Sequence, residues 1–201
     1  MTENDPVKIG GLLLAAGGST RLGRPKQLIG FQGKTLIRRA AETLLESACD
    51  PVVIVLGASA KHLLAEINDL SVTICTNHEW EDGMSSSIKT GLAELLEIDS
   101  KLDAAVITLC DQPFVTSTDI DSLITEYRSG CQAIVASVYN GTVGVPALFS
   151  KDHFVKLASL TGDQGARKII RDHPGDVRTI AIEHAAYDID TDADLAQIMD
   201  R

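Results

Sequence analysis

Glycines and cations are concentrated in a short stretch near the N-terminus. The sequence LAAGGSTRLGRPKQ, residues 14–27, places Arg21, Lys26 and a further arginine within six residues. Gly17 and Gly18 allow a close approach of the backbone, so successive N–H groups can point into one concavity. The cations repel one another unless an anion offsets their charge, and a polyphosphate does so through charge-assisted hydrogen bonds. The stretch therefore predicts a polyphosphate site.

The spacing of the glycines matches neither of the two common phosphate-binding loops. The dinucleotide pattern G-x-G-x-x-G is absent because Ser19 stands two residues after Gly17. The pattern G-x-x-x-x-G-K-[ST] is absent because Gly18 and Gly23 are followed by arginine and proline instead of lysine and a hydroxyl residue. A different class of phosphate site is expected.

Aspartates far downstream are candidate ligands for a divalent metal. Asp111 directly follows the apolar run AAVITLC, where a carboxylate can hold Mg²⁺ together with phosphate oxygens. The segment DIDTDADL, residues 188–195, adds Asp188 and Asp190. On a strand these two side chains would face opposite sides, so we expect only one of them to point inward. No nucleophilic side chain is needed if an acceptor phosphate attacks an α-phosphorus in line.

Short apolar runs alternate with helical patterns along the chain. The strand candidates are residues 8–15, 51–57, 71–76, 104–110, 132–139, 145–149 and 177–182. The helix candidates are residues 35–48, 59–67, 85–97, 116–128 and 195–199. Ser59 is an expected N-cap, and Thr116 with Asp119 and Thr191 with Asp194 have capping-box spacing. The alternation predicts an α/β fold with a three-layer, doubly wound, mostly parallel Rossmann-like sheet, in which ligands bind at the carboxyl ends of the strands.

Composition bounds the class of protein. A hydrophobic share of 44% and a charged share of 23% are typical of a globular chain, and no composition shift divides residues 1–201, so we expect a single domain. The net charge of −10 argues against a nucleic-acid partner. The apolar runs are too short to cross a membrane, and the acidic start is unlike a signal peptide, so we expect a cytoplasmic protein with no membrane partner. In that setting the four widely spaced cysteines are expected to be buried thiols.

The stretch LAAGGSTRLGRPKQLI resembles the signature of nucleotidyltransferases that condense a nucleoside triphosphate with an acceptor phosphate and release pyrophosphate. Further segments match in order: NHEWEDGMSSSIKTGL, LCDQPF, NGTVGVPALFS, GDQGAR and DIDTDADL. Together they resemble the molybdenum cofactor cytidylyltransferase branch, in which the GMSSS segment is the sharper discriminator from guanylyltransferases. The resemblance implies transfer of CMP from CTP to molybdopterin, a nucleotidyltransferase-type sheet, and Mg²⁺ as cofactor with Mn²⁺ as the alternative.

The resemblance also implies roles for individual residues. Arg21, Lys26 and Asp111 are the expected catalytic residues, and Asp111 and Asp190 are the expected metal ligands. The expected nucleotide-binding residues are Ala15, Ala16, Gly17, Gly18, Arg21, Lys26, Gly83, Ser85 and Ser86, of which the two serines suit the carbonyl edge of a pyrimidine. The expected acceptor-binding residues are Gly144, Gly162 and Arg167.

Several alternatives remain open at the level of sequence. The sequence Gly144-Val145-Pro146 stands where relatives of this branch often have G-H-P, which leaves the identity of the acceptor open. A guanylyltransferase or a nucleotidyltransferase for another small phosphorylated acceptor is the alternative enzyme. A non-catalytic molybdopterin-binding accessory protein is the alternative outside enzymes. A transient complex with a molybdenum hydroxylase is compatible with each of them.

Overall fold

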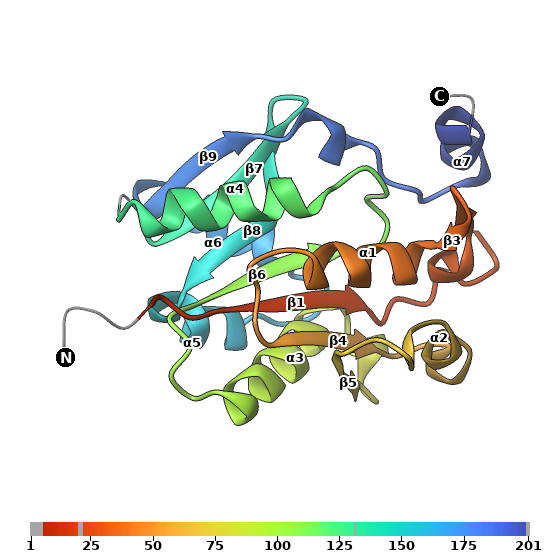
Figure 1. Cartoon of the computed structure of the whole chain (residues 1–201), viewed down its shortest axis with the longest axis horizontal. Helices are drawn as coiled ribbons and strands as arrows, with labels where there is room; N and C mark the ends of the chain where they lie inside the picture. The colour runs from red at the N-terminus through yellow and green to blue at the C-terminus, as the bar shows by residue number, and fades with distance from the viewer. Residues whose placement is uncertain (1–5, 20–21, 131, 200–201) are drawn as a thin grey trace.

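Seven strands of the described residues form one mostly parallel sheet through the middle of the molecule (Figure 1). The structure is a computed structural model, and it describes residues 6–19, 22–130 and 132–199. The strand order is β5-β4-β1-β6-β8-β7-β9. The strands are β1 (Ile9–Ala15), β4 (Val52–Leu56), β5 (Thr73–Thr76), β6 (Ala104–Leu109), β7 (Ile134–Tyr139), β8 (Thr142–Ser150) and β9 (Val177–Ala181). A separate short hairpin joins β2 (Gly30–Phe31) to β3 (Lys34–Thr35).

The register of the sheet brings the ends of β1 and β6 to the same edge. β1 lies between β4 and β6 and is parallel to both, with Leu14 opposite Leu109. The residues that follow these two strands therefore lie side by side, although about 95 positions separate them in the sequence. β8 runs antiparallel to both β6 and β7, so the sheet is mostly but not wholly parallel. The chain turns from β7 into β8 at Asn140 and Gly141, which both have positive φ, as a two-residue hairpin requires.

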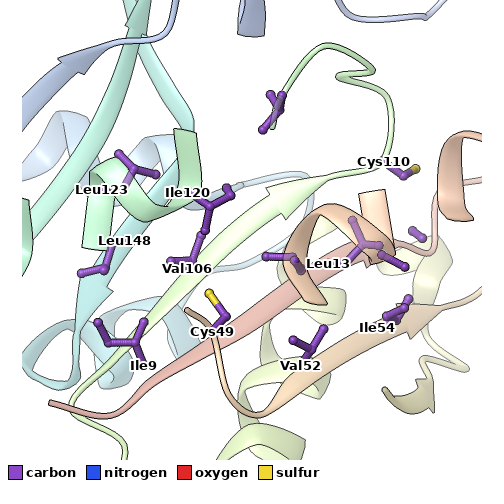
Figure 2. Close-up of a cluster of buried hydrophobic side chains, with 14 of the residues drawn as sticks. Ile9, Leu13, Cys49, Val52, Ile54, Val106, Cys110, Ile120, Leu123 and Leu148 are labelled. Atoms are coloured by element: carbon purple, nitrogen blue, oxygen red, sulfur yellow. The ribbon is translucent and has the colours of Figure 1, made fainter. Parts of the chain in front are cut away.

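Helices cover both faces of the sheet and complete three layers. α1 (Leu36–Leu45), α2 (Ala60–Ile67) and α4 (Ser117–Arg128) pack on one face, and α3 (Met84–Ile98), α5 (Phe154–Ala158) and α6 (Ala166–Asp172) pack on the other. Successive side chains of a strand alternate between these layers, so Leu13 lies in the first cluster and Leu12 in the second. Figure 2 shows the first cluster, in which Leu13 on the sheet lies in the same apolar layer as Ile120 on α4. The predicted fold class is confirmed.

Two of the three predicted caps form capping hydrogen bonds through their side chains. Thr116 and Asp119 form a reciprocal capping box at the start of α4. Thr191 and Asp194 exchange the same hydrogen bonds at the start of α7 (Asp192–Met199). Ser59 occupies the N-cap position of α2 as expected, but it has a left-handed φ of 63° and its side chain makes no capping hydrogen bond.

Three of the cysteines lie within the described chain, and their thiols are free. Cys49 and Cys110 are buried, whereas Cys75 is only partly so. Burial raises the pKa of the Cys49 thiol to about 11, so this thiol is protonated at neutral pH. Across the described residues, no helix has the length and apolar character needed to span a membrane.

Candidate active site

A cavity of about 410 Å³ opens at the carboxyl edge of the sheet. Its walls come from the end of β1 and the loop after it, from the end of β6, and from the start of α3 with the 3₁₀ turn Trp80–Asp82 before it. The register of β1 and β6 thus places the glycine loop and Asp111 on two walls of one space. Segments far apart in the sequence converge where an open α/β sheet binds its ligands.

Lys26 contacts both predicted metal-binding aspartates. Its Nζ lies 2.5 Å from Asp111 Oδ2 and 2.8 Å from Asp190 Oδ1. The lysine opens the 3₁₀ turn Lys26–Leu28, directly after the glycine loop. Burial alone would lower the pKa of Lys26, but the charge of Asp111 and the hydrogen bonds to both carboxylates outweigh it and raise the pKa. The ammonium is therefore charged throughout the physiological range.

The second oxygen of Asp111 is a buried acceptor to which no described residue donates a hydrogen bond. Leaving such an atom unsatisfied is costly, so it indicates a ligand that donates or coordinates there. Within the described chain no three His, Cys, Asp or Glu side chains gather as a metal site. Mg²⁺ nevertheless suits this arrangement, because it commonly takes one or two carboxylates and completes its shell with phosphate oxygens and water. Asp111 and Asp190 therefore fit the expected metal.

A third apolar cluster positions Asp190. Its neighbour Ile189 is fully buried against Ile29, Phe31 and Leu36. The Ile189 N–H donates to the carbonyl oxygen of Asp111 at 3.0 Å, which ties the two acidic segments together. Packing against the short hairpin and this backbone bond together explain why Asp190 reaches the end of β6.

The reasoning from strand alternation at Asp188 and Asp190 is wrong, because residues 187–190 form no strand. Asp190 nevertheless is the one of the two that contacts Lys26. Asp188 is more exposed than Asp190, but it is close enough to Asp111 for that charge to act on it. Partial burial and the charge of Asp111 raise its pKa.

The glycine loop lines the cavity as a stretch of bare backbone. Ala15, Ala16, Gly17 and Gly18 all face it. A Cβ at Gly18 would lie 2.9 Å from Trp80 Cζ3, so only glycine allows the tryptophan ring to pack on the loop. Arg21, predicted to contact the triphosphate, lies outside the described residues.

The structure places Ser87, rather than Ser85 or Ser86, on the cavity wall. Ser86 is turned toward its own loop, where its Oγ lies 2.8 Å from the carbonyl oxygens of Glu79 and Gly83. The Asn77 side chain donates to Oγ of both Ser86 and Ser87, at 2.8 and 3.0 Å. The base contacts predicted for Ser85 and Ser86 stay a prediction, and the start of α3 makes Ser87 the serine that faces this cavity.

Gly83 lines the cavity as predicted and has a backbone that only glycine adopts without strain. Its φ is 98°, and a Cβ there would lie 2.5 Å from the carbonyl carbon and oxygen of Gly162. Gly162 in turn accepts a hydrogen bond from the Ser85 N–H at 3.2 Å. The neighbouring wall residues Trp80 and Met84 are not among the predicted site residues, although both lie within the segment NHEWEDGMSSSIKTGL.

The predicted acceptor-binding residues fall into two separate contacts outside this cavity. A Cβ at Gly144 would lie 2.8 Å from Arg167 Nη2, so the glycine allows the guanidinium to pack on β8. Arg167 Nη2 donates to the Tyr139 hydroxyl at 3.2 Å, which donates to the Val145 carbonyl oxygen at 3.0 Å. Gly162 instead lies against Gly83. The structure therefore joins Gly144 with Arg167 but does not join either with Gly162.

Comparison with known proteins places this site in a family. The MobA-like NTP transferase domain matches residues 11–177. The nicotine blue oxidoreductase of Paenarthrobacter nicotinovorans is 33% identical, over 95% of this chain and 96% of that protein. A probable molybdenum cofactor guanylyltransferase of Bacillus cytotoxicus is 26% identical, over 65% of this chain and 62% of that protein.

A solved structure shows the same fold. The manganese complex of Rv0371c from Mycobacterium tuberculosis H37Rv aligns with a TM-score of 0.81 and 25% identity, over 96% of this chain and 99% of that one. The family model covers most of the chain, including the glycine loop, Lys26 and Asp111. The chain therefore belongs to the MobA-like NTP transferase domain family.

Proposed function

We propose that this chain is a metal-dependent nucleotidyltransferase whose 201 residues form one catalytic domain, and that it transfers CMP from CTP to molybdopterin with release of pyrophosphate. The observation that carries the proposal is the contact of Lys26 with both Asp111 and Asp190 beside a glycine loop. A cation and a carboxylate that line one cavity, with a second carboxylate in contact with the same cation, suit a triphosphate that arrives with a divalent metal.

Each described residue of the site has a part in this reaction. The backbone of Ala16, Gly17 and Gly18 offers N–H groups to the phosphates. Asp111 and Asp190 would hold Mg²⁺, or Mn²⁺ in its place, and the metal when bound neutralises charge on the triphosphate. The Lys26 ammonium stabilises the charge that develops on the α-phosphoryl group and on the leaving pyrophosphate.

The covalent chemistry needs no group from the protein. An oxygen of the acceptor phosphate forms a bond to the α-phosphorus as the bond to the β-phosphate oxygen breaks, and pyrophosphate leaves with that electron pair. The protein contributes alignment of the two reactants and charge neutralisation. We assign Arg21 to the triphosphate as well, on the resemblance of the loop alone.

The choice of CTP as nucleotide and of molybdopterin as acceptor rests on resemblance and on the named relatives. Resemblance of the GMSSS segment to cytidylyltransferases favours CTP, and the Ser87 hydroxyl on the cavity wall can donate to a pyrimidine carbonyl. The relatives named as molybdenum cofactor guanylyltransferases favour a molybdopterin acceptor and make GTP the alternative nucleotide. Gly144 and Arg167 stay candidates for acceptor contacts. A cytoplasmic location and delivery of the product to a molybdenum hydroxylase agree with this proposal.

Pyrophosphate release provides the test. The purified protein is given CTP or GTP with Mg²⁺ and molybdopterin, and we expect release that depends on both acceptor and metal and is faster with CTP. Asp111→Asn should abolish turnover while the protein stays folded. The matched control is Asp152→Asn, which should leave turnover unchanged. Asp152 is exposed and follows the C-terminal end of β8, at the edge of the sheet away from Asp111. Wild-type turnover in Asp111→Asn would overturn the proposed metal site.

A second candidate function is favoured by the full-length relative named nicotine blue oxidoreductase. It is an oxidoreductase reaction on nicotine blue, for which the same cavity would hold a nucleotide cofactor by its phosphates. A change in the absorbance of nicotine blue with a reduced nicotinamide nucleotide, measured beside pyrophosphate release, separates the two functions. Oxidoreductase turnover of nicotine blue without any pyrophosphate release would favour this second function and overturn the first.

A further inference from the structure

A buried glutamine holds together the two ends of the glycine loop. Gln27 is 1% exposed and lies directly after Lys26. Its Nε2 donates to the carbonyl oxygen of Ala15 at 3.1 Å and to that of Gly17 at 2.7 Å. Its Oε1 accepts from the Ser19 hydroxyl at 3.2 Å. One side chain thus binds the last residue of β1 and two residues of the loop that follows.

The hydrogen-bonding groups around Gln27 allow only one orientation of its amide. A primary amide has two N–H donors, and here each of them meets a carbonyl oxygen. If the amide were rotated by half a turn, its own oxygen would face these two carbonyl oxygens and repel them. A glutamine with all its polar groups engaged in the interior is rigid, because both its rotamer and its orientation are fixed by neighbours.

Ser19 extends this contact to the backbone of Lys26. Its Oγ accepts a hydrogen bond from the Lys26 N–H at 3.0 Å while it donates to Gln27. Ser19 has a left-handed φ of 52°, a conformation that a non-glycine residue keeps only when its surroundings hold it. Lys26 is therefore fixed to the loop through its backbone and to Asp111 and Asp190 through its ammonium.

The direction of the loop's N–H groups follows from the same contacts. In a trans peptide the C=O and N–H bonds point in opposite directions across one plane. A Gly17 carbonyl held by Gln27 consequently sets the direction of the Gly18 N–H, and the Ala15 carbonyl does the same for the Ala16 N–H. Both Ala16 and Gly18 line the cavity.

We propose that Gln27 is a positioning residue, whose amide presets the backbone donors of the glycine loop and the Lys26 ammonium for a triphosphate. The ligand named here rests on the proposed function. The effect of Gln27 on the loop does not rest on it, and a probe that needs no substrate can measure that effect.

Trp80 supplies the probe. It is the only tryptophan in the chain, and it packs directly on the loop at Gly18. Its emission and its quenching by acrylamide therefore report on the loop in the protein without nucleotide. Gln27→Met keeps the length of the side chain but removes both donors and the acceptor. Ser19→Ala leaves both amide donors of Gln27 in place but removes the donor to Gln27 Oε1 and the acceptor of the Lys26 N–H, and it carries the test if Gln27→Met does not fold.

The matched control is Leu123→Ala, which lowers stability from the core beneath α4, away from the cavity. We expect Gln27→Met to shift the Trp80 emission, to raise its quenching, and to weaken binding of CTP with Mg²⁺ roughly 10- to 100-fold. Ser19→Ala should act in the same direction with a smaller effect. Leu123→Ala should change neither the emission nor the affinity.

The outcomes separate this inference from the proposed function. Trp80 emission and quenching that stay at their wild-type values in Gln27→Met would overturn the positioning role. An equal shift in Leu123→Ala would overturn it too, because the effect would then follow stability alone. A Trp80 shift confined to Gln27→Met and Ser19→Ala, in a protein that binds no triphosphate even as wild type, would support the role of Gln27 in the loop and overturn the proposed function.

Discussion

Replacement of Lys26 by methionine removes the charge that separates two carboxylates. Asp111 Oδ2 and Asp190 Oδ1 both contact the same ammonium, at 2.5 and 2.8 Å, so they lie at most about 5.3 Å apart. At that separation two negative charges repel by about 3 kcal/mol for an effective dielectric constant near 20. The side chains of Asp111 and Asp190 are 13% and 34% exposed, so solvent screens part of this repulsion.

The cost to stability follows from these numbers. Burial of the Lys26 ammonium is itself unfavourable, and methionine recovers part of that cost. We therefore expect Lys26→Met to lower the free energy of unfolding by about 2 kcal/mol in a metal-free buffer with a chelator. Urea unfolding followed by circular dichroism measures this difference from the midpoint and the slope. Turnover should fall by roughly 100- to 1,000-fold, the loss typical of removing one stabilising donor from a transition state.

A double variant tests the reason for the loss. Lys26→Met combined with Asp190→Asn removes one of the two repelling charges, so we expect it to be more stable than Lys26→Met alone. Asp190→Asn by itself, in which Lys26 keeps one partner, should have a free energy of unfolding close to that of the wild type. A Lys26→Met variant as stable as the wild type, or a double variant that is less stable than Lys26→Met, would refute the electrostatic reasoning.

Three further predictions follow from the structure. Gly83→Ala should destabilise the protein by about 2 kcal/mol or more, measured by urea unfolding, because its φ is 98° and its Cβ would meet a backbone carbonyl at 2.5 Å. Burial raises the pKa of Asp119, but hydrogen bonds, first among them that of His184, outweigh it and lower the pKa. The ionised Asp119 therefore stabilises the fold above the ordinary pKa range of aspartate, and this stabilisation is lost as the pH falls through the lowered value. Asp119→Asn should accordingly make the free energy of unfolding fall less steeply at acid pH. Ser87→Ala should weaken CTP binding about tenfold in calorimetry, whereas Ser85→Ala, away from the cavity wall, should not.

The residue proximities that the sequence predicts are those set by the sheet. Apolar runs identified β1 and β6, and residues that follow parallel neighbouring strands must meet at one edge. The proximity of Lys26 to Asp111 follows from this rule and from a short connecting loop. The position of Asp190 depends on packing of Ile189 against a small hairpin, which no periodicity in the sequence indicates.

The sequence does not predict side-chain directions that depend on where a helix begins. Successive helical positions differ by about 100°, so the exact start of α3 determines whether Ser86 or Ser87 faces the cavity. That start is set by Gly83, whose tight contact with Gly162 comes from a distant segment. Gln27 was missed because a lone buried glutamine has no pattern, and its partners are backbone carbonyls that a sequence does not display.

The antiparallel direction of β8 determines where the turn between β7 and β8 lies. Because β7 runs parallel to β6, the turn at Asn140 and Gly141 projects from the edge of the sheet at which Asp111 lies. Such a tip can be lengthened at little cost in loop entropy and without disturbing either buried layer. If the proposed function holds, exchange of this tip alone would alter contacts to the acceptor while Lys26, Asp111 and the glycine loop keep their places.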